Sequence, residues 1–568
     1  MRGATDRGEL ADQDLALDLE TNDEEEDRHQ PVIDPVRRHQ QDPTSSVAAR
    51  ERTERREKSI GGRGDLGHVR NDASSAGHWP RGPAAEPCTS GTATLRAIWQ
   101  IPLTTMIRQL VILGATGDLT RRSLLPAVAS LLADRRLPAD FRVTAVGRRD
   151  WDDRAYLHWL LPPSPGTDLL EPARRALEGV VAYRSADLTD PRQLRAILAP
   201  AMDPMVLYLA LPPAVFAPAI ESLTVAGLPT GSRVVIEKPF GSDLASARQL
   251  NELLHGLLPE DSVYRIDHFL HKQTVQNILG LRFANRVFES IWSTAHIEEI
   301  EIVWDEALGL EGRASYYDRA GALLDMIQNH LLQLLALISM EGPKSLDPGD
   351  LRDRKVEVLR AIRRFDPSEV ATRTTRARYT AGVVAGRAMP SYVDEPGVDP
   401  SRHTETYAEA TFSIDDPRWA GTSFRLRTGK ALARPRREIL VHFHDVQHVV
   451  FREVASASAN LLHLTLDPDT ITFRLNINGA GDPFTLETVN LDVQLAAQEI
   501  PAYGRLLLGI LDGDATFSIR DDEAEEAWRV IEPIAVGWRE GISPLGEYEA
   551  GSAGPRPGTQ LVVDQASR

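Results

Sequence analysis

A short apolar run, Gln109–Leu113, leads directly into a glycine-containing loop at residues 114–119 and then into a segment with helical spacing at 124–132. An almost continuous apolar run of this length is typical of a strand buried on both faces of a parallel sheet. Further strand-like runs follow at residues 141–146, 206–211 and 233–236. Strands that alternate with helices predict βαβ units, and therefore an α/β domain of the Rossmann type.

Composition and periodicity divide the chain into four parts. Residues 1–105 have clustered charges and few apolar residues at regular spacing, so they are predicted to form a disordered, low-complexity extension. Residues 106–270 carry the βαβ pattern. Residues 271–548 mix helix-like and alternating strand-like stretches, which predicts a larger α+β domain with a mainly antiparallel sheet. Residues 549–568 are rich in glycine, proline and serine and are predicted to be a loose tail. An alternative for the front is that translation starts at Met106.

Charge and cysteine content exclude several classes of protein. Acidic residues outnumber basic ones 82 to 64, giving a net charge of −18, whereas binding to nucleic acid requires a basic face. One cysteine in 568 residues excludes a disulfide framework and multi-cysteine metal sites. We find no signal sequence, and no apolar run that approaches the roughly 18 residues needed to span a bilayer. We therefore expect a cytoplasmic protein with no nucleic-acid or membrane partner.

The loop after the first strand has the properties of a phosphate-binding loop. Glycine permits a tight turn and close approach of backbone N–H groups to a pyrophosphate, and the following helix N-terminus adds partial positive charge. The candidate cofactor-binding residues here are Gly114, Thr116, Gly117, Asp118 and Leu119. Two glycines three apart also occur in ordinary strand–helix turns, so that alternative stays open.

The end of the second predicted strand bears on the choice of dinucleotide. It reads Gly147-Arg148-Arg149, where an NAD site would carry an acid for the ribose 2′-hydroxyl. Arg148 suits a 2′-phosphate instead, although two solvated arginines at a strand end are a simpler explanation. The pattern favours NADP over NAD as the cofactor.

A series of more specific motifs follows along the chain. They are YLALPP at 208–213, EKPFG at 237–241, RIDHFLHK at 265–272, QNIL at 276–279, LRFAN at 281–285, DMIQNH at 325–330, RTGKAL at 427–432 and AYGRLLL at 502–508. In this order, over residues 107–538, they closely resemble the glucose-6-phosphate 1-dehydrogenase family. The resemblance implies NADP-dependent oxidation of glucose 6-phosphate at C1 to 6-phosphoglucono-1,5-lactone, in the oxidative pentose phosphate pathway. It also implies a homodimer or homotetramer assembled through the larger domain.

The resemblance assigns roles to particular residues. His330 is implied to be the base that takes the C1 hydroxyl proton, and Asp267 the carboxylate that orients its ring. A histidine suits this task because its pKa lies near neutrality, although a lone His330 would otherwise be a core or capping residue. The implied substrate-binding residues are Lys238, which would also contact the nicotinamide, together with His268, Lys272, Glu306, Asp325 and Lys430. Hydride transfer requires no metal ion, so we expect none.

Spacing supports some of these assignments and not others. His268 and Lys272 lie four apart, so on a helix they would share a face and could clamp a phosphate; an isolated pair of this kind is more often an exposed polar face. Asp325 and His330 lie five apart, about 140° around an ideal α-helix. Helical spacing would not pair these two side chains.

Several positions depart from the family pattern. Ser123 replaces a common lysine, and Phe269 lacks a hydroxyl that would donate to the phosphate, a loss of about 1.5–3 kcal/mol. His271 replaces a glycine and could either donate a hydrogen bond or obstruct the site. Pro435, which lies between Arg434 and Arg436, occupies a position where the family usually has a basic residue. A glutamine-type position is occupied by Asp467.

These departures predict an active enzyme with weakened or shifted substrate affinity. One alternative is a paralogue that oxidises another hexose or hexose phosphate. Another is a non-catalytic NADP-binding partner subunit. Retention of both Asp267 and His330 argues against the second alternative, because a binding module has no use for a base.

Overall fold

The computed structural model describes residues 106–161, 171–199, 203–451, 458–481, 484–496 and 498–555. The predicted extension at 1–105 lies outside the described residues, as does the tail beyond residue 555. All described residues belong to one compact unit of the chain.

The first sheet is the parallel sheet that the apolar runs predict. Its strands are β1 (Gln109–Leu113), β2 (Arg142–Gly147), β3 (Val181–Ser185), β4 (Val206–Leu209), β5 (Arg233–Glu237) and β6 (Val263–Ile266). They are arranged in the order β3-β2-β1-β4-β5-β6, and every neighbouring pair is parallel. This is the strand order of a dinucleotide-binding fold, so the predicted Rossmann-type domain is confirmed.

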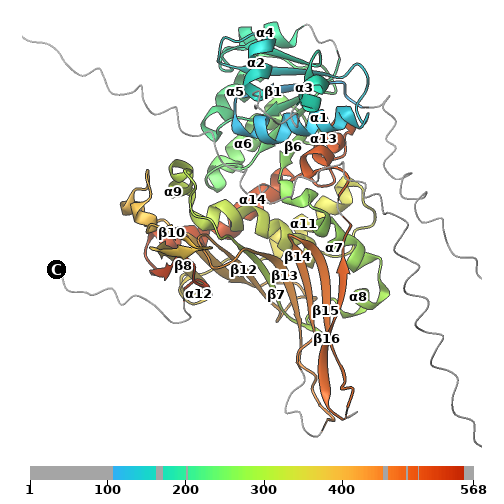
Figure 1. Cartoon of the computed structure of the whole chain (residues 1–568), viewed down its shortest axis with the longest axis vertical. Helices are drawn as coiled ribbons and strands as arrows, with labels where there is room; N and C mark the ends of the chain where they lie inside the picture. The colour runs from blue at the N-terminus through green and yellow to red at the C-terminus, as the bar shows by residue number, and fades with distance from the viewer. Residues whose placement is uncertain are drawn as a thin grey trace, which may run out of the picture. The chain divides into compact units, whose positions relative to one another are not determined.

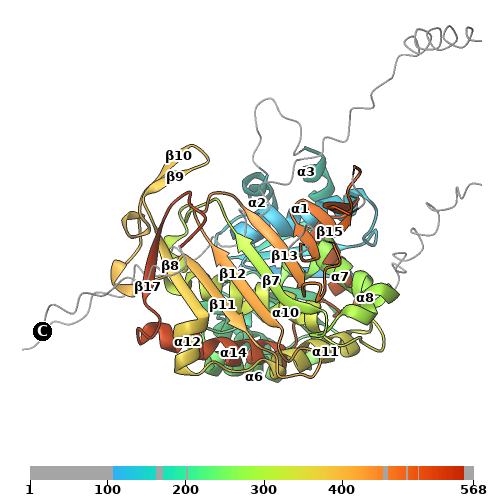
Figure 2. The same ribbon diagram turned by 90° about the horizontal axis from the view of Figure 1, so that it is seen from below.

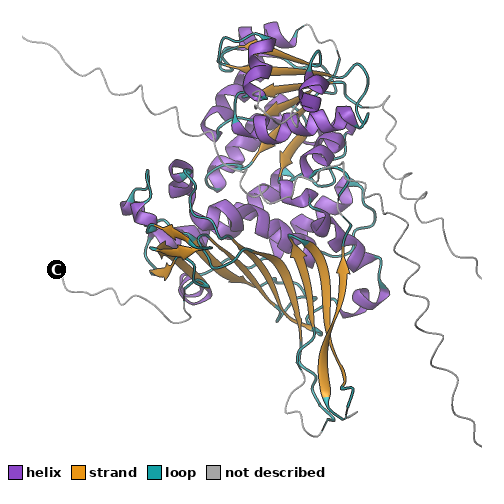
Figure 3. Cartoon of the chain, viewed as in Figure 1, coloured by secondary structure: helices purple, strands orange, loops and turns teal. Residues whose placement is uncertain are grey.

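Helices connect these strands and lie around the sheet (Figure 3). They are α1 (Leu125–Ala133), α2 (Asp153–Leu160), α3 (Glu171–Leu177), α4 (Pro191–Leu198), α5 (Pro213–Ala226) and α6 (Leu244–Leu257). The predicted helix at 124–132 begins earlier than expected, as the π-helix Thr120–Leu124 that continues into α1. The chain reverses its winding between β1 and β4, which therefore form the topological switch point where ligands bind in such sheets.

The second sheet has nine strands and is mostly antiparallel. Its strands are β7 (Ile297–Asp305), β8 (Thr374–Thr380), β11 (Tyr407–Phe412), β12 (Ser423–Gly429), β13 (Arg436–Phe443), β14 (Leu461–Leu466), β15 (Asp469–Asn478), β16 (Leu486–Gln494) and β17 (Leu545–Glu549). Only the pairs β7–β12 and β8–β17 are parallel among the described strands of this sheet. The short strands β9 (Gly382–Val384) and β10 (Arg387–Met389) form a separate hairpin. The predicted α+β domain is thus confirmed.

Helices cover one face of the nine-stranded sheet (Figure 1), and Figure 2 looks onto the opposite face, where the strands lie in front. The helices that follow β6 are α7 (Gln273–Phe283), α8 (Arg286–Ile291), α9 (Ala314–Ala322), α10 (Leu332–Ser339), α11 (Pro348–Ala361), α12 (Pro367–Arg373), α13 (Ala502–Asp512) and α14 (Asp521–Arg539). The π-helix Leu323–Leu331 joins α9 to α10 and packs against β11, β12 and α14. Helix α13 contacts α1 of the first domain, a return that the sequence pattern did not indicate.

Two further segments differ from simple expectation. The run Ala314–Ser339 has the length and apolar composition of a membrane span, but 89% of its apolar window is buried inside the protein, as in the core helix of a globular protein.

Residues 549–555, the start of the tail expected to be loose, are held by hydrogen bonds. Gly551 N donates to Ala431 O, and Ala433 N donates to Ser552 O.

Candidate active site

The glycine loop lies at the switch point of the parallel sheet. Gly114 has φ +88°, and a Cβ at this residue would lie 2.1 Å from the carbonyl oxygen of Ala210, which follows β4. Only glycine fits there, because both its backbone conformation and its contact with β4 exclude a side chain. Gly117 N donates to Gly114 O at 3.0 Å, and a helix starts at Asp118, directly after the loop, so its N-terminus adds partial positive charge there.

The residues after β2 lie beside this loop. A Cβ on Gly147 would meet Thr116 Cγ2 at 3.0 Å and Tyr183 Oη at 2.8 Å, so β2 ends in close contact with the loop. Arg148 and Arg149 are exposed there, and the guanidinium of Arg149 lies 4.9 Å from the Trp151 ring centre. The residues present therefore fit a dinucleotide: a glycine cradle, a helix N-terminus and solvent-facing arginines at the end of the second strand.

The carboxyl ends of β5 and β6 carry the next two candidates. Lys238 directly follows β5 and Asp267 directly follows β6. Because β5 and β6 are parallel neighbours, both side chains start from the same edge of the sheet as the glycine loop. This edge is where ligands of such sheets bind.

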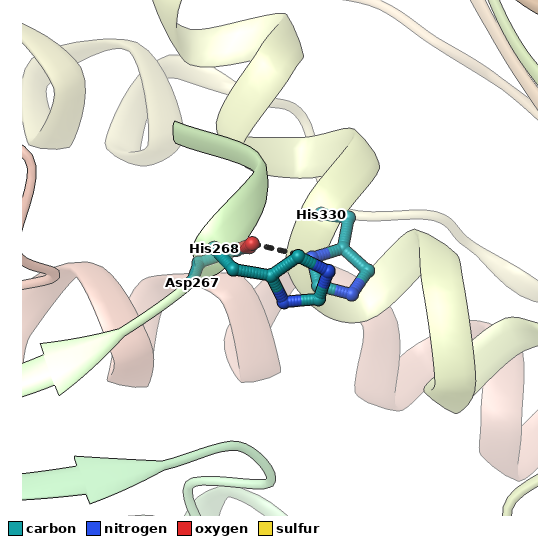
Figure 4. Close-up of side chains that lie close together, drawn as sticks. All are labelled: Asp267, His268 and His330. Carbon is teal, nitrogen blue, oxygen red and sulfur yellow. Dashed lines mark hydrogen bonds and ion pairs between the residues drawn. The ribbon is translucent and has the colours of Figure 1, made fainter. Parts of the chain in front are cut away.

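His330 reaches Asp267 from the other domain. Its Nδ1 lies 2.6 Å from Asp267 Oδ1, and both side chains are 1% exposed (Figure 4). Asp267 Oδ1 also accepts a hydrogen bond from Phe269 N at 3.0 Å. The carboxylate is thus fixed by the 3₁₀-helix His268–His271, whose first turn it caps, and it fixes the imidazole in turn.

The local helix type explains why Asp325 and His330 both serve this site. They lie in the π-helix Leu323–Leu331, whose hydrogen bonds join residues five apart. Residues five apart therefore stack about one turn above each other, rather than 140° apart as in an α-helix. The expectation from α-helical spacing fails here because the helix is not an α-helix.

Burial and neighbouring charges set the protonation of the pair. Burial lowers the pKa of His330, Asp267 raises it and Lys238 lowers it again, for a net downward shift. Burial raises the pKa of Asp267, but the charge and hydrogen bond of His330 outweigh it and lower that pKa to about 2. At neutral pH the carboxylate is ionised and the imidazole is neutral. Nδ1–H then donates to Asp267, and Nε2 keeps a lone pair that can accept a proton.

An aromatic stack holds the imidazole plane. The rings of Phe269 and His330 are stacked, with centres 3.7 Å apart and planes 6° apart. On its other side Phe269 packs against Trp304, 4.2 Å between centres, and both residues are fully buried. Sequence reasoning considered Phe269 only for its missing hydroxyl and did not single out Trp304. The available signal for Trp304 was its sequence position at the end of β7, directly before Asp305 and Glu306.

Four other candidate substrate-binding residues form two ion pairs. Lys238 Nζ lies 3.9 Å from Asp325 Oδ1 and 3.4 Å from the Asp325 carbonyl oxygen. Glu306 and Lys430 follow the parallel neighbours β7 and β12, and Lys430 Nζ lies 2.5 Å from Glu306 Oε2. Lys430 Nζ also lies 5.0 Å from the ring centre of Tyr317, a residue that sequence reasoning missed. The structure thus gathers acids and cations from both domains.

His268 and Lys272 do not share a helix face, so that expectation is wrong. The 3₁₀-helix ends at His271, and Lys272 has extended backbone as the N-cap of α7. The two side chains instead meet around Phe269, whose ring centre lies 4.9 Å from that of His268 and 5.3 Å from Lys272 Nζ. The short 3₁₀ turn therefore places both side chains near one ring without α-helical periodicity.

The positions that depart from the family pattern have different surroundings. Ser123 is half-buried in the π-helix before α1. The ring of His271 packs edge-on against Phe517, and burial lowers its pKa to about 4, so it is uncharged at neutral pH. Pro435 is exposed. Asp467 forms an ion pair with Arg437, 2.7 Å between Oδ2 and Nη1.

The ligand atoms of Asp267, His268 and His330 lie within 4.8 Å of one another, a spacing that could hold a cation. The Oδ1 and Nδ1 atoms of Asp267 and His330 are already joined by their hydrogen bond. A neutral imidazole oriented by a buried carboxylate is an arrangement suited to removing a proton from a hydroxyl group. Together with a dinucleotide loop at the same sheet edge, it suits oxidation of an alcohol.

Comparison with known proteins agrees with this geometry. Residues 111–277 match the family model "Glucose-6-phosphate dehydrogenase, NAD binding domain", and residues 279–568 match "Glucose-6-phosphate dehydrogenase, C-terminal domain". The glucose-6-phosphate 1-dehydrogenase of Gluconobacter oxydans is 41% identical over 470 residues, which covers 80% of this chain and 95% of that protein. That of Treponema pallidum is 38% identical over 489 residues, covering 81% and 94%.

Solved structures give the same result. A glucose-6-phosphate dehydrogenase in complex with its substrate glucose 6-phosphate matches with a TM-score of 0.73 and 30% identity, covering 79% of this chain and 95% of the other. The glucose-6-phosphate 1-dehydrogenase of Mycobacterium avium matches with a TM-score of 0.69 and 34% identity over the same shares of the two chains.

Proposed function

This chain belongs to the glucose-6-phosphate dehydrogenase family, and we propose on that premise that it oxidises glucose 6-phosphate at C1 with NADP as the hydride acceptor. The product is 6-phosphoglucono-1,5-lactone, the first product of the oxidative pentose phosphate pathway. The observation that carries the proposal is the buried His330–Asp267 pair at the carboxyl edge of the dinucleotide-binding sheet.

His330 acts as the base in this mechanism. Its Nε2 takes the proton of the C1 hydroxyl while Asp267, bonded to Nδ1, stabilises the imidazolium that forms. A bound nicotinamide would supply the acceptor for the C1 hydride. Phe269 keeps the imidazole from rotating because it stacks on the whole ring face. A base that is already fixed in orientation and shielded from water lowers the activation barrier, because little entropy is lost when the reacting groups align.

The sugar phosphate is held by groups from both domains. His268 and Lys272 bind the phosphate, and the carboxylates of Glu306 and Asp325 accept hydrogen bonds from sugar hydroxyls. In the structure Lys430 and Lys238 pair with these two acids, which holds the buried carboxylates in place. Lys238 and Lys430 are then positioned to donate to the sugar as well.

NADP is the proposed cofactor rather than NAD. The glycine loop and the start of its helix, Gly114 to Leu119, hold the pyrophosphate, and Lys238 contacts the nicotinamide. Arg148 is exposed at the end of β2, the position that faces the adenine ribose in this fold, and its guanidinium suits a 2′-phosphate.

The test is a steady-state assay of the full chain with glucose 6-phosphate, glucose and a small panel of hexose phosphates, each with NADP and with NAD. NADP-linked turnover of glucose 6-phosphate supports the proposal. Preference for another hexose favours a paralogue, and absence of turnover despite NADP binding favours a non-catalytic partner subunit.

A substitution tests the assignment of the base. His330→Asn removes the proton acceptor, so turnover should fall by roughly two to four orders of magnitude, the usual contribution of a positioned base. His255→Asn is the matched control, because His255 is exposed on α6. Full turnover in His330→Asn would contradict the mechanism.

We also propose a homodimer or homotetramer, formed through the nine-stranded sheet. The strands β15 and β16 extend beyond the helices (Figure 1) and expose Ile477, Leu491 and Val493, at 45–57%. Apolar side chains of this kind on a sheet are typical of an interface between subunits. Sedimentation of the native protein measures the mass, and a monomer would contradict the proposal.

A cytoplasmic location stays a prediction.

A further inference from the structure

One arginine breaks the apolar character of the buried face of β13. The positions of this strand that face the helices are apolar, as at Ile439 and Val441, which are fully buried. Arg437 occupies the next position on the same face, with a side chain only 7% exposed. Its cross-strand neighbour is Trp304 of β7, and the guanidinium lies 5.1 Å from the indole centre. A cation at a core-facing position costs desolvation, so its presence there needs a physical reason.

Trp304 connects Arg437 with the candidate active site. Lys272 Nζ lies 5.1 Å from the same indole, so two cations are held against one buried ring. The ring of Phe269 packs against Trp304 and stacks on His330. The chain of contacts thus runs from Arg437 and Lys272 through two aromatic rings to the candidate base.

The acid that balances Arg437 lies partly in solvent. Asp467 pairs with Nη1 at 2.7 Å, but the Asp467 side chain is 43% exposed and can be solvated when another anion takes its place. Arg437 presents a planar donor array that matches a phosphate with two hydrogen bonds. Pro435, which is exposed and uncharged, occupies the position where the family usually has a basic residue. Its neighbour Arg436 lies on the opposite face and pairs with Glu438.

We propose that Arg437 determines specificity for the phosphate of the sugar substrate, which it binds together with Lys272 and His268. The inference rests on the proposed function, since the phosphate belongs to that substrate. Asp467 holds the guanidinium in place before the substrate binds and yields it to the phosphate. In this chain the cation missing at position 435 is therefore supplied two residues further along, from the core-facing side of β13.

The experiment compares wild type with Arg437→Gln, a substitution of similar length without charge. The KM for glucose 6-phosphate should rise roughly ten- to a hundredfold, the loss of one charge-assisted contact, while kcat and the KM for NADP stay nearly constant. The Ki of inorganic phosphate, as a competitor of glucose 6-phosphate, should rise by a similar factor. Calorimetry with inorganic phosphate measures the same loss without turnover.

Arg436→Gln is the matched control on the same strand and should leave all these constants unchanged. Arg437→Lys keeps the charge but not the planar array, so it should give an intermediate KM; it carries the same test if the glutamine variant does not fold. An unchanged KM and phosphate Ki in an active variant would overturn the role of Arg437. A fall in kcat with an unchanged phosphate Ki would also overturn it, since that is the effect of a structural role. Absence of glucose 6-phosphate turnover in the wild type would instead contradict the proposed function itself.

Discussion

Asp267→Asn is the substitution whose effect can be worked out most directly from the structure. The carboxylate lies 2.6 Å from His330 Nδ1, and both side chains are excluded from water. As the proton moves to His330, an imidazolium forms with its charge roughly 4 Å from the carboxylate. At an effective dielectric constant of about 20, two such charges attract each other by about 4 kcal/mol. Loss of most of this stabilisation should lower kcat by roughly 10²- to 10³-fold.

The pH dependence gives this prediction a second readout. Asp267 raises the pKa of His330 against the effect of burial, so removing its charge lowers the pKa of His330 further. The acid limb of kcat/KM, where His330 becomes protonated and inactive, should therefore move to lower pH. A loss of geometry alone would lower activity without moving this limb.

Steady-state kinetics between pH 4 and 9 (roughly the range over which histidine and carboxylate groups titrate) measures both effects. Asp318→Asn is the control, because Asp318 is also buried but bonds to Tyr392 instead of the candidate base. It should reduce stability and leave kcat nearly unchanged. A loss of kcat below about tenfold in Asp267→Asn, with an unmoved acid limb, would refute the electrostatic reasoning.

Three further predictions concern the cofactor loop, the cofactor choice and a buried acid. Gly114→Ala places a Cβ 2.1 Å from Ala210 O at φ +88°, so the KM for NADP should rise about tenfold or more, as measured by steady-state titration of the cofactor; an unchanged KM would show that the loop can relax. Arg148→Ala should raise the KM for NADP roughly ten- to a hundredfold without changing that for NAD, and equal losses would show that Arg148 does not bind the 2′-phosphate. Burial raises the pKa of Glu405 to about 7, so its ionisation destabilises the folded state as pH rises from about 4.5 to above 7, by on the order of 3 kcal/mol. Glu405→Gln should therefore raise the Tm at pH 8 relative to wild type and not at pH 4, and a lower Tm at pH 8 would contradict this account.

Glu405 also shows how the helix with the candidate base is anchored. Its Oε1 accepts a hydrogen bond from Leu323 N at 3.0 Å, at the start of the π-helix. Gly321, just before this helix, has φ +64°, and a Cβ there would lie 2.3 Å from Glu405 Oε1. The carboxylate therefore occupies the space that any larger residue at position 321 would need. This contact joins Glu405, in the loop just before β11, to the helix more than eighty residues away in the chain, and no local pattern indicates it.

The sequence predicted the parallel sheet and its ligand-binding edge well. Strands buried on both faces appear as short apolar runs, and glycine is required where β1 passes close to β4. Because the carboxyl ends of parallel strands meet at one edge, the positions of Lys238 and Asp267 after β5 and β6 already placed them near the glycine loop. The mixed character of the second sheet also followed from its alternating strands, although its strand order did not.

The sequence by itself therefore determined the fold class and, through its motifs, the residues that gather at the site, because these depend on local periodicity and on residue type. Only the tertiary structure decided how those residues meet. The π-helix brings Asp325 and His330 to one site, the 3₁₀ turn places His268 and Lys272 around Phe269, and Trp304 joins Arg437 to that group. The π-helix and the 3₁₀ turn are local geometries that an assumed α-helical period does not give, whereas the contacts of Trp304 join side chains far apart in the chain through tertiary packing. Periodicity within one element carries no information about such packing.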